Sequence, residues 1–182
     1  SEYSEDSENS EPSDSLSQSS EKKQKLDHPI AYRANDSIVL FSNGTAQLHG
    51  KSKVDYQSMQ LESEFIRVHM DSSLIFARGV YDSVEGEWVG RPVFKDRNDS
   101  YESHEMTYNI STQKGFIRNV VTQQGEGYVV AERTKKANDK DMMMAGGRYT
   151  TCDDHEHPHF YLKMTKAKVR PKEHISTGPA YM

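Results

Sequence analysis

Short β-like runs separated by turn residues are the feature that most constrains this chain. From Asp36 onward these runs are interrupted by Gly, Pro, Asn or Asp, and no segment sustains a 3.6-residue apolar period. Residues 37–41 and 45–49 flank Asn43-Gly44, the strongest short-range signal for a β-hairpin. The chain is therefore predicted to be all-β. Further strands are expected at residues 60–70, 74–80, 102–110, 115–122, 127–133 and 159–169.

Two of these runs resemble one another. Residues 74–80 and 115–120 each place an aromatic or aliphatic residue before Arg, then Gly or Asn, then Val. The pattern indicates a two-strand unit used about three times, with a period of about 40 residues. A repeat of this kind predicts rungs stacked edge to edge, each burying its apolar face on the next.

The last long run changes face along its length. Phe160, Leu162 and Met164 share one side of an extended strand, whereas Ala167 and Val169 occupy the other. Such a switch requires a bulge or a strand that passes between two sheets, as in jelly rolls. Leu, Ile, Val and Phe make up about 18% of the chain, below the roughly 20% of well-packed domains. Two apolar faces enclosing a narrow space are therefore expected.

The acidity of the chain lies in its N-terminal segment. The formal net charge is −5, and residues 1–21 contain seven Asp or Glu and no Lys or Arg. Residues 1–35 are predicted to be a disordered acidic, Ser-rich segment that precedes a single β-domain at residues 36–182. The remainder is close to neutral, so a nucleic-acid partner is not expected.

Cys152 and the nearby histidines are the most reactive group of residues. His155, His157 and His159 alternate, so an extended chain does not converge them on one tetrahedral ion, and turn or hydrogen-bonding roles are favoured over a metal site. A single cysteine excludes an internal disulfide. Without an oxyanion loop or a nucleophile elbow, a disulfide to a partner outside this chain is favoured over catalysis. Neither a metal nor another cofactor is expected.

Several strings in the second half resemble a known family. Residues 115–127 lead to Arg-Tyr-Thr-Thr-Cys at 148–152, His-Pro-His-Phe-Tyr at 157–161 and Thr-Gly-Pro-Ala-Tyr at 177–181. Together they resemble the OstA-like N-terminal periplasmic domain of the lipopolysaccharide-assembly outer-membrane protein, the LptD family of Gram-negative bacteria. The resemblance covers about residues 36–182. It implies a β-jellyroll of stacked antiparallel strands with an open hydrophobic groove.

The resemblance also implies a function and partners. The family's domain lies at the periplasmic face of the outer membrane, accepts lipopolysaccharide from a periplasmic bridge protein and passes its acyl chains to the protein's own C-terminal β-barrel, which has an outer-membrane lipoprotein partner. Cys152 matches the family cysteine that pairs with one near the end of the barrel, whereas the additional N-terminal cysteine of the best-known members has no counterpart. Met182 then resembles a truncation point ahead of the barrel. A non-enzymatic transport module is implied.

The groove is expected to be lined by apolar members of the alternating runs. The edge strand near residues 37–41 is expected to dock the bridge protein by β-augmentation. The run 142–144 fits a strand end and a groove lining equally well. A β-scaffold that binds protein partners without contacting lipid is the alternative function, and an enzyme centred on Cys152 is disfavoured. The expected groove residues are Phe65, Val68, Leu74, Phe76, Phe116, Val120, Val130, Met143, Phe160, Leu162 and Met164.

Overall fold

The described part of the chain is built from β-strands. The computed structural model describes residues 28–182 except residues 98, 138–139, 156 and 171–172. The all-β prediction is confirmed, while residues 1–27 of the predicted N-terminal segment lie outside the described residues. The strands are β1 Ala31–Arg33, β2 Ser37–Leu40, β3 Thr45–Tyr56, β4 Met59–His69, β5 Leu74–Arg78, β6 Val80–Asp82, β7 Glu87–Val89, β8 Val93–Asp96, β9 Asp99–Glu102, β10 Glu105–Asn109, β11 Lys114–Gln124, β12 Gly127–Lys136, β13 Met142–Thr150, β14 Leu162–Arg170, β15 His174–Thr177 and β16 Ala180–Tyr181.

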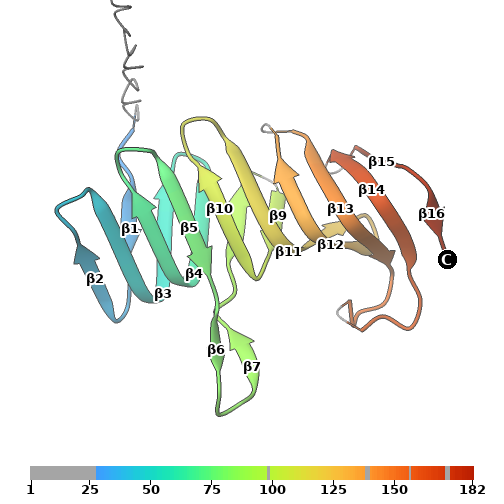
Figure 1. Cartoon of the computed structure of the whole chain (residues 1–182), viewed down its shortest axis with the longest axis horizontal. Helices are drawn as coiled ribbons and strands as arrows, with labels where there is room; N and C mark the ends of the chain where they lie inside the picture. The colour runs from blue at the N-terminus through green and yellow to red at the C-terminus, as the bar shows by residue number, and fades with distance from the viewer. Residues whose placement is uncertain (1–27, 98, 138–139, 156, 171–172) are drawn as a thin grey trace, which may run out of the picture.

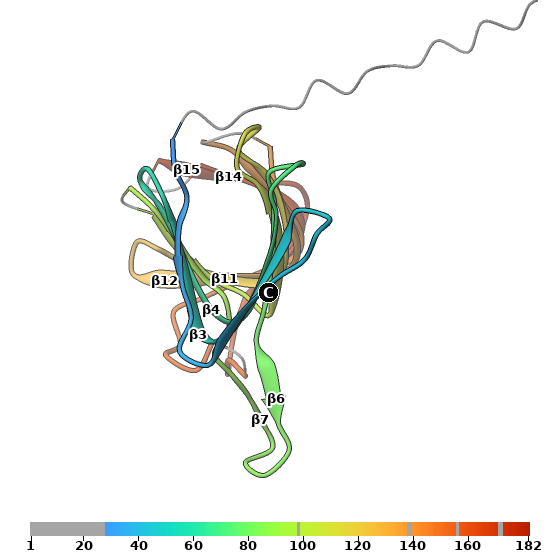
Figure 2. The ribbon, with the colours of Figure 1, turned by 90° about the vertical axis from the view of Figure 1, so that its left-hand side faces the viewer.

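The long strands run through two walls that face one another (Figures 1 and 2). All of their pairings are antiparallel, and each pair of facing residues lies within one wall or the other. We call the two halves wall A and wall B. Wall A comprises β2, residues 45–49 and 65–69, β5, β10, residues 114–118, 133–136, 142–145 and 166–170, and β15. Wall B comprises β1, residues 52–56 and 59–63, β8, β9, residues 120–124, 127–131, 147–150 and 162–164, and β16.

A row of irregular residues marks the bend between the walls. Asn119, Glu132, Gly146 and Thr165 face one another across β11 to β14, and on each strand the buried side changes at this row. Asn119 and Gly146 have φ values of 50° and 65°, in the left-handed region that lets a strand turn sharply. The row confirms the face switch predicted for the last long run.

The N-terminal half bends by different devices. On β3, Gly50 and Lys51 together oppose Glu64 of β4, so the register shifts there by a β-bulge. β5 stops at the bend, and the chain then leaves the walls as the β6–β7 hairpin (Figure 1). β8 resumes the ladder beside β4. The two similar runs of the sequence are thus strands that reach the bend at Gly79 and Asn119.

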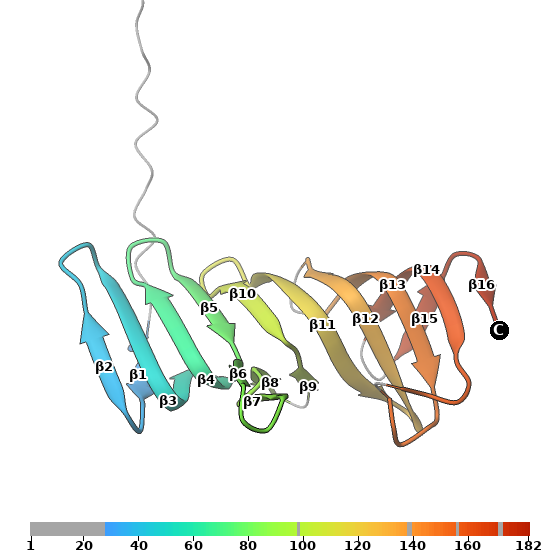
Figure 3. The same ribbon diagram turned by 60° about the horizontal axis from the view of Figure 1, so that its bottom comes forward.

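Within the described part of the chain, strand edges lie unpaired at both ends of the stack (Figure 3). There, β1 and β2 each pair only with β3, and β15 and β16 each pair only with β14. The Asn43-Gly44 hairpin is confirmed between β2 and β3. The predicted domain boundary at residue 36 is too late, because β1 already belongs to wall B. A central strand at Met142–Thr150 was not predicted, since Gly146-Gly147 has the composition of a turn.

Candidate functional site

The space between the walls is the main apolar region of the protein. Inward side chains of both walls form one buried cluster, although the chain is poor in large aliphatic residues. Thin walls explain this, because only alternate residues of each strand face inward. The largest fully buried side chains are Phe94, Leu48, Leu61, Ile66, Ile75, Met106, Ile117, Met142, Met164, Val54, Val120 and Val129.

An aromatic cluster closes the middle of this space. Phe94 on β8 stacks on Tyr101 of β9 with ring centroids 5.6 Å apart, and both belong to wall B. Tyr108 on β10 of wall A approaches Phe94 from the opposite side at 5.0 Å. The three rings are nearly fully buried, so here the two walls pack directly on one another.

The two ends of the space are hollow. At the N-terminal end, a cavity of about 330 Å³ lies between β1 and wall A and is lined by Ile30, Tyr32, Ala46 and Val68, among others. At the C-terminal end, a cavity of about 650 Å³ is lined mainly by residues of wall B and by β15. Its lining residues are Gln124, Gly125, Tyr149, Leu162, Met164, Glu173, His174, Ile175 and Thr177. Each cavity would admit part of an elongated apolar ligand.

The structure places only some of the predicted groove residues between the walls. Val68, Val120 and Met164 belong to the buried cluster, and Leu162 lines the C-terminal cavity. The inward orientation is wrong for the others on strands, which alternate with buried neighbours and so lie on outer faces. These outward residues are Phe65, Leu74, Phe76, Phe116, Val130 and Met143.

The bends explain the errors on the strands that pass through them, which are those at Phe65, Phe116, Val130 and Met143. Alternate residues of a strand face inward, but the set that faces inward changes from odd-numbered to even-numbered residues, or the reverse, at the bend. Ile117 and Val120 therefore both face inward although they are three residues apart. Phe160 lies in the loop before β14, where its side chain is 56% exposed. The run 142–144 proves to be within a central strand, with Met142 and Met144 inward and Met143 outward.

Three contributors to the cavities were missed by the sequence interpretation. Tyr149 and Ile175 pack against the core at the C-terminal end, and Ile30 does so at the N-terminal end. Ile30 and Ile175 lie outside any long alternating run. The only available signal was Tyr149, an aromatic residue beside the conspicuous Thr-Thr-Cys string.

The loop between β13 and β14 covers part of the outer face of wall B. His155 stacks on Tyr128 with ring centroids 5.0 Å apart, and the His157 amide donates to the Asp154 carboxylate over 3.0 Å. Hydrogen bonding from Thr150 lowers the pKa of the Cys152 thiol below its usual 9.0, with smaller contributions from the residues just before β14. His155 and His157 are therefore engaged in packing and turn formation.

Other kinds of site have little support in the described residues. Within those residues no cluster of three His, Cys, Asp or Glu is placed to hold a metal ion. The same residues include no helix with the length and apolar character needed to cross a bilayer.

Comparisons with known proteins identify the fold. No family model matches the chain, and no curated protein matches its sequence. Among solved structures, it is similar to LptH of Pseudomonas aeruginosa, described as the LptA-homologous periplasmic component of the lipopolysaccharide transport device. The TM-score is 0.53 at 14% identity, and the match covers 85% of this chain and 97% of that chain. The chain has the fold of LptH. The predicted β-jellyroll is thereby confirmed, and the resemblance to the LptD family stays a prediction.

Proposed function

We propose that the chain carries the acyl chains of lipopolysaccharide between its two walls, accepting the lipid from a periplasmic bridge and passing it to an outer-membrane barrel. The observation that carries this proposal is the apolar space between the walls, hollow at both ends, in a protein with the fold of LptH. The chain would act at the periplasmic face of the outer membrane of a Gram-negative bacterium. It would not be an enzyme, because moving a lipid makes and breaks no bond.

The construction of the two walls allows an acyl chain to enter between them. Each pair of facing residues in the ladders of the described residues lies within one wall, so no backbone ladder has to open when the walls move apart about the bend. An acyl chain that enters between Phe94 and Tyr108 replaces contacts between apolar side chains by contacts with lipid. Burial of apolar surface is worth roughly 25 cal/mol per Å² in either case, so the exchange costs little.

The unpaired edges provide docking positions at both ends of the stack. β2 pairs only with β3, and its Ile38, Val39 and Leu40 side chains are exposed. An incoming strand of the bridge protein would extend wall A by β-augmentation and continue the apolar space. At the other end, β15 and β16 would lead toward the protein's own barrel and its lipoprotein partner. The Ile38 amide points away from β3, because the amides of Val39 and Phe41 lie on the side of β3. Ile38→Pro should abolish docking of the bridge protein while circular dichroism shows an unchanged β-sheet signal, and intact docking would refute this role of β2.

Photocrosslinking to lipopolysaccharide tests the transport proposal. A benzophenone amino acid is placed at Val68, beside the N-terminal cavity, and at Leu162, beside the C-terminal cavity. The matched controls are Arg67 and Lys163, the adjacent residues of the same strands, which face outward. Lipid adducts at the two inward positions and none at the controls are expected. A folded protein with no inward adducts would refute the proposal, as would equal adducts at all four positions.

A β-scaffold that binds protein partners without lipid is the second candidate. The observation that favours it is the packed centre, where Phe94 and Tyr108 fill the space between the two cavities. The crosslinking experiment separates the two functions, because a scaffold would form protein adducts at β2 and no lipid adducts at Val68 or Leu162.

A further inference from the structure

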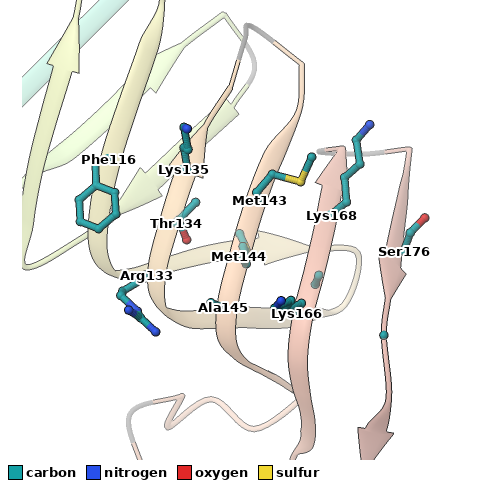
Figure 4. Close-up of a pocket in the computed structure, with 12 residues that line it drawn as sticks. Phe116, Arg133, Thr134, Lys135, Met143, Met144, Ala145, Lys166, Lys168 and Ser176 are labelled. Carbon is teal, nitrogen blue, oxygen red and sulfur yellow. The ribbon is translucent and has the colours of Figure 1, made fainter.

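The outer face of wall A gathers basic side chains from strands far apart in the sequence. Strand register puts Lys135, Met143 and Lys168 in one row across β12, β13 and β14. The next row toward the bend contains Arg133, Ala145 and Lys166 on the same three strands. Figure 4 shows Met143 between Lys135 and Lys168, and Ala145 between Arg133 and Lys166.

These two rows border a hollow with an apolar floor. The hollow has a volume of about 600 Å³, and Met143 and Ala145 form its floor on β13. Cations on the flanking strands lie on backbones about 9–10 Å apart, twice the strand spacing, which leaves room for an anion between them. Phe116 on β11 borders one side, with a ring that is 43% exposed. We call this site the outer basic pocket.

Few acidic groups offset the charge of the outer basic pocket. The Asp141 carboxylate binds Lys168 at 3.1 Å and Arg170 at 2.9 Å. Arg133, Lys135 and Lys166 form no ion pair with another described residue. Like charges held this close repel one another, so the arrangement has a cost in the free protein that a bound anion would remove. The apolar floor and the Phe116 ring suit the hydrocarbon or sugar body that carries such an anion.

The position of the pocket relates it to the space between the walls. Lys135 is the penultimate residue of β12 and Met143 is the second of β13, so the outer row of the pocket lies within about two residues of the free margin of wall A. On the opposite face of the same strands, Met142 and Val169 border the interior. An amphiphile whose acyl chains lie between the walls could fold its headgroup over this margin.

We propose that the outer basic pocket binds the phosphorylated headgroup of an amphiphile whose acyl chains enter between the walls. This inference rests on the proposed function and specifies its substrate class, because only a phosphate-bearing lipid would use both sites. Arg133 and Lys166 provide charge-assisted hydrogen bonds to the phosphate from opposite sides, and Lys135 adds a third cation. Met143 and Phe116 contact the body of the headgroup.

The binding test uses soluble short-chain lipids and the whole chain. Dihexanoyl phosphatidic acid is titrated against the protein, with dihexanoyl phosphatidylcholine and inorganic phosphate as separate probes, and amide NMR shifts report the position of binding. Phosphatidic acid should bind at least about tenfold more tightly than either other probe, with shifts at β12 to β14. Its affinity should fall as salt is raised, because the contact is ionic. Equal binding of inorganic phosphate would overturn the lipid assignment, and equal binding of phosphatidylcholine would overturn the phosphate assignment.

Charge variants identify the residues responsible. Arg133→Gln combined with Lys166→Gln should weaken binding of phosphatidic acid by about tenfold or more. The matched control is Lys95→Gln combined with Lys163→Gln, which removes the same charge from exposed positions of wall B and should leave affinity unchanged. The pocket variant should melt no lower than wild type, since it relieves repulsion. Equal effects of the two variants would reduce the observation to general charge attraction and refute the pocket.

The same variants separate this inference from the transport proposal. If inward crosslinks to lipopolysaccharide at Leu162 persist undiminished in the pocket variant and phosphatidic acid binds it normally, the pocket is refuted while lipid transport stands. If phosphatidic acid binds the pocket but no inward crosslink forms, lipid transport between the walls is refuted, and with it the part of the inference that places the acyl chains there.

Discussion

Replacing Phe94 by alanine tests whether the two walls are packed on one another. The Phe94 side chain is only 1% exposed and contacts aromatic rings of both walls. Truncation of a buried phenylalanine to alanine costs about 3–5 kcal/mol, because the transfer free energy is lost and a cavity remains. Domains of this kind are stable by about 5–15 kcal/mol, so the variant should retain only part of its stability.

Urea unfolding followed by far-UV circular dichroism measures this loss. Fluorescence is less suitable, because Trp88 lies on the projecting hairpin and is 44% exposed. With a slope of about 2 kcal/mol per M, the midpoint should fall by about 1.5–2.5 M. The control is Phe160→Ala, at a position that is 56% exposed, where a change within about 0.5 kcal/mol is expected. A loss below about 1 kcal/mol for Phe94→Ala would show that the walls do not meet at this ring.

Three further predictions concern the bend and the ionisable groups. Two neighbouring cations lower the pKa of Asp141 from 3.8 to about 2, so its carboxylate stabilises the fold above pH 3.8, and that contribution is lost as the pH falls toward 2. The stability difference between wild type and Asp141→Asn should therefore shrink in urea titrations across this window, and a constant difference would contradict the assignment. Gly146→Ala and Gly125→Ala should each cost about 1–2 kcal/mol for a left-handed φ, because Gly125 has open space around it and an added Cβ at Gly146 meets only the movable end of the exposed Glu132 side chain; a clearly larger loss for Gly146→Ala in thermal melts would show that Glu132 cannot move aside. Thr150→Val should raise the pKa of Cys152, shifting the pH midpoint of iodoacetamide alkylation upward, and an unchanged midpoint would disprove the contribution of Thr150.

Local signals in the sequence were sufficient for the fold class. The turn at Asn43-Gly44 and the change of face between Met164 and Ala167 both depend on neighbouring residues, and both are confirmed. The β6–β7 hairpin and the central strand β13 were missed, because glycines near the bend have the composition of turns.

The interior positions could not be assigned in the same way. Before the bend the odd-numbered residues of β11 face inward, and beyond it the even-numbered residues do. Phe116 therefore faces outward although Val120, also even-numbered, faces inward. The outer basic pocket depends on register alone. Arg133 and Lys166 are more than thirty residues apart in the chain, and only their shared pairing with Ala145 brings them together. Sequence alternation contains no information on which residue of a distant strand will be opposite.

The β6–β7 hairpin shows where this architecture accepts additional chain. It leaves the walls after Gly79 and the backbone returns by Arg91, and the ladder beside β4 continues in β8. The Gly79 amide still donates to the His104 carbonyl, so the insertion does not disturb the neighbouring rung. The outside of the bend is therefore a natural graft site. An epitope, a fluorescent reporter or a whole additional domain placed between residues 83 and 86 would project away from both walls and leave the stack and its two ends as they are.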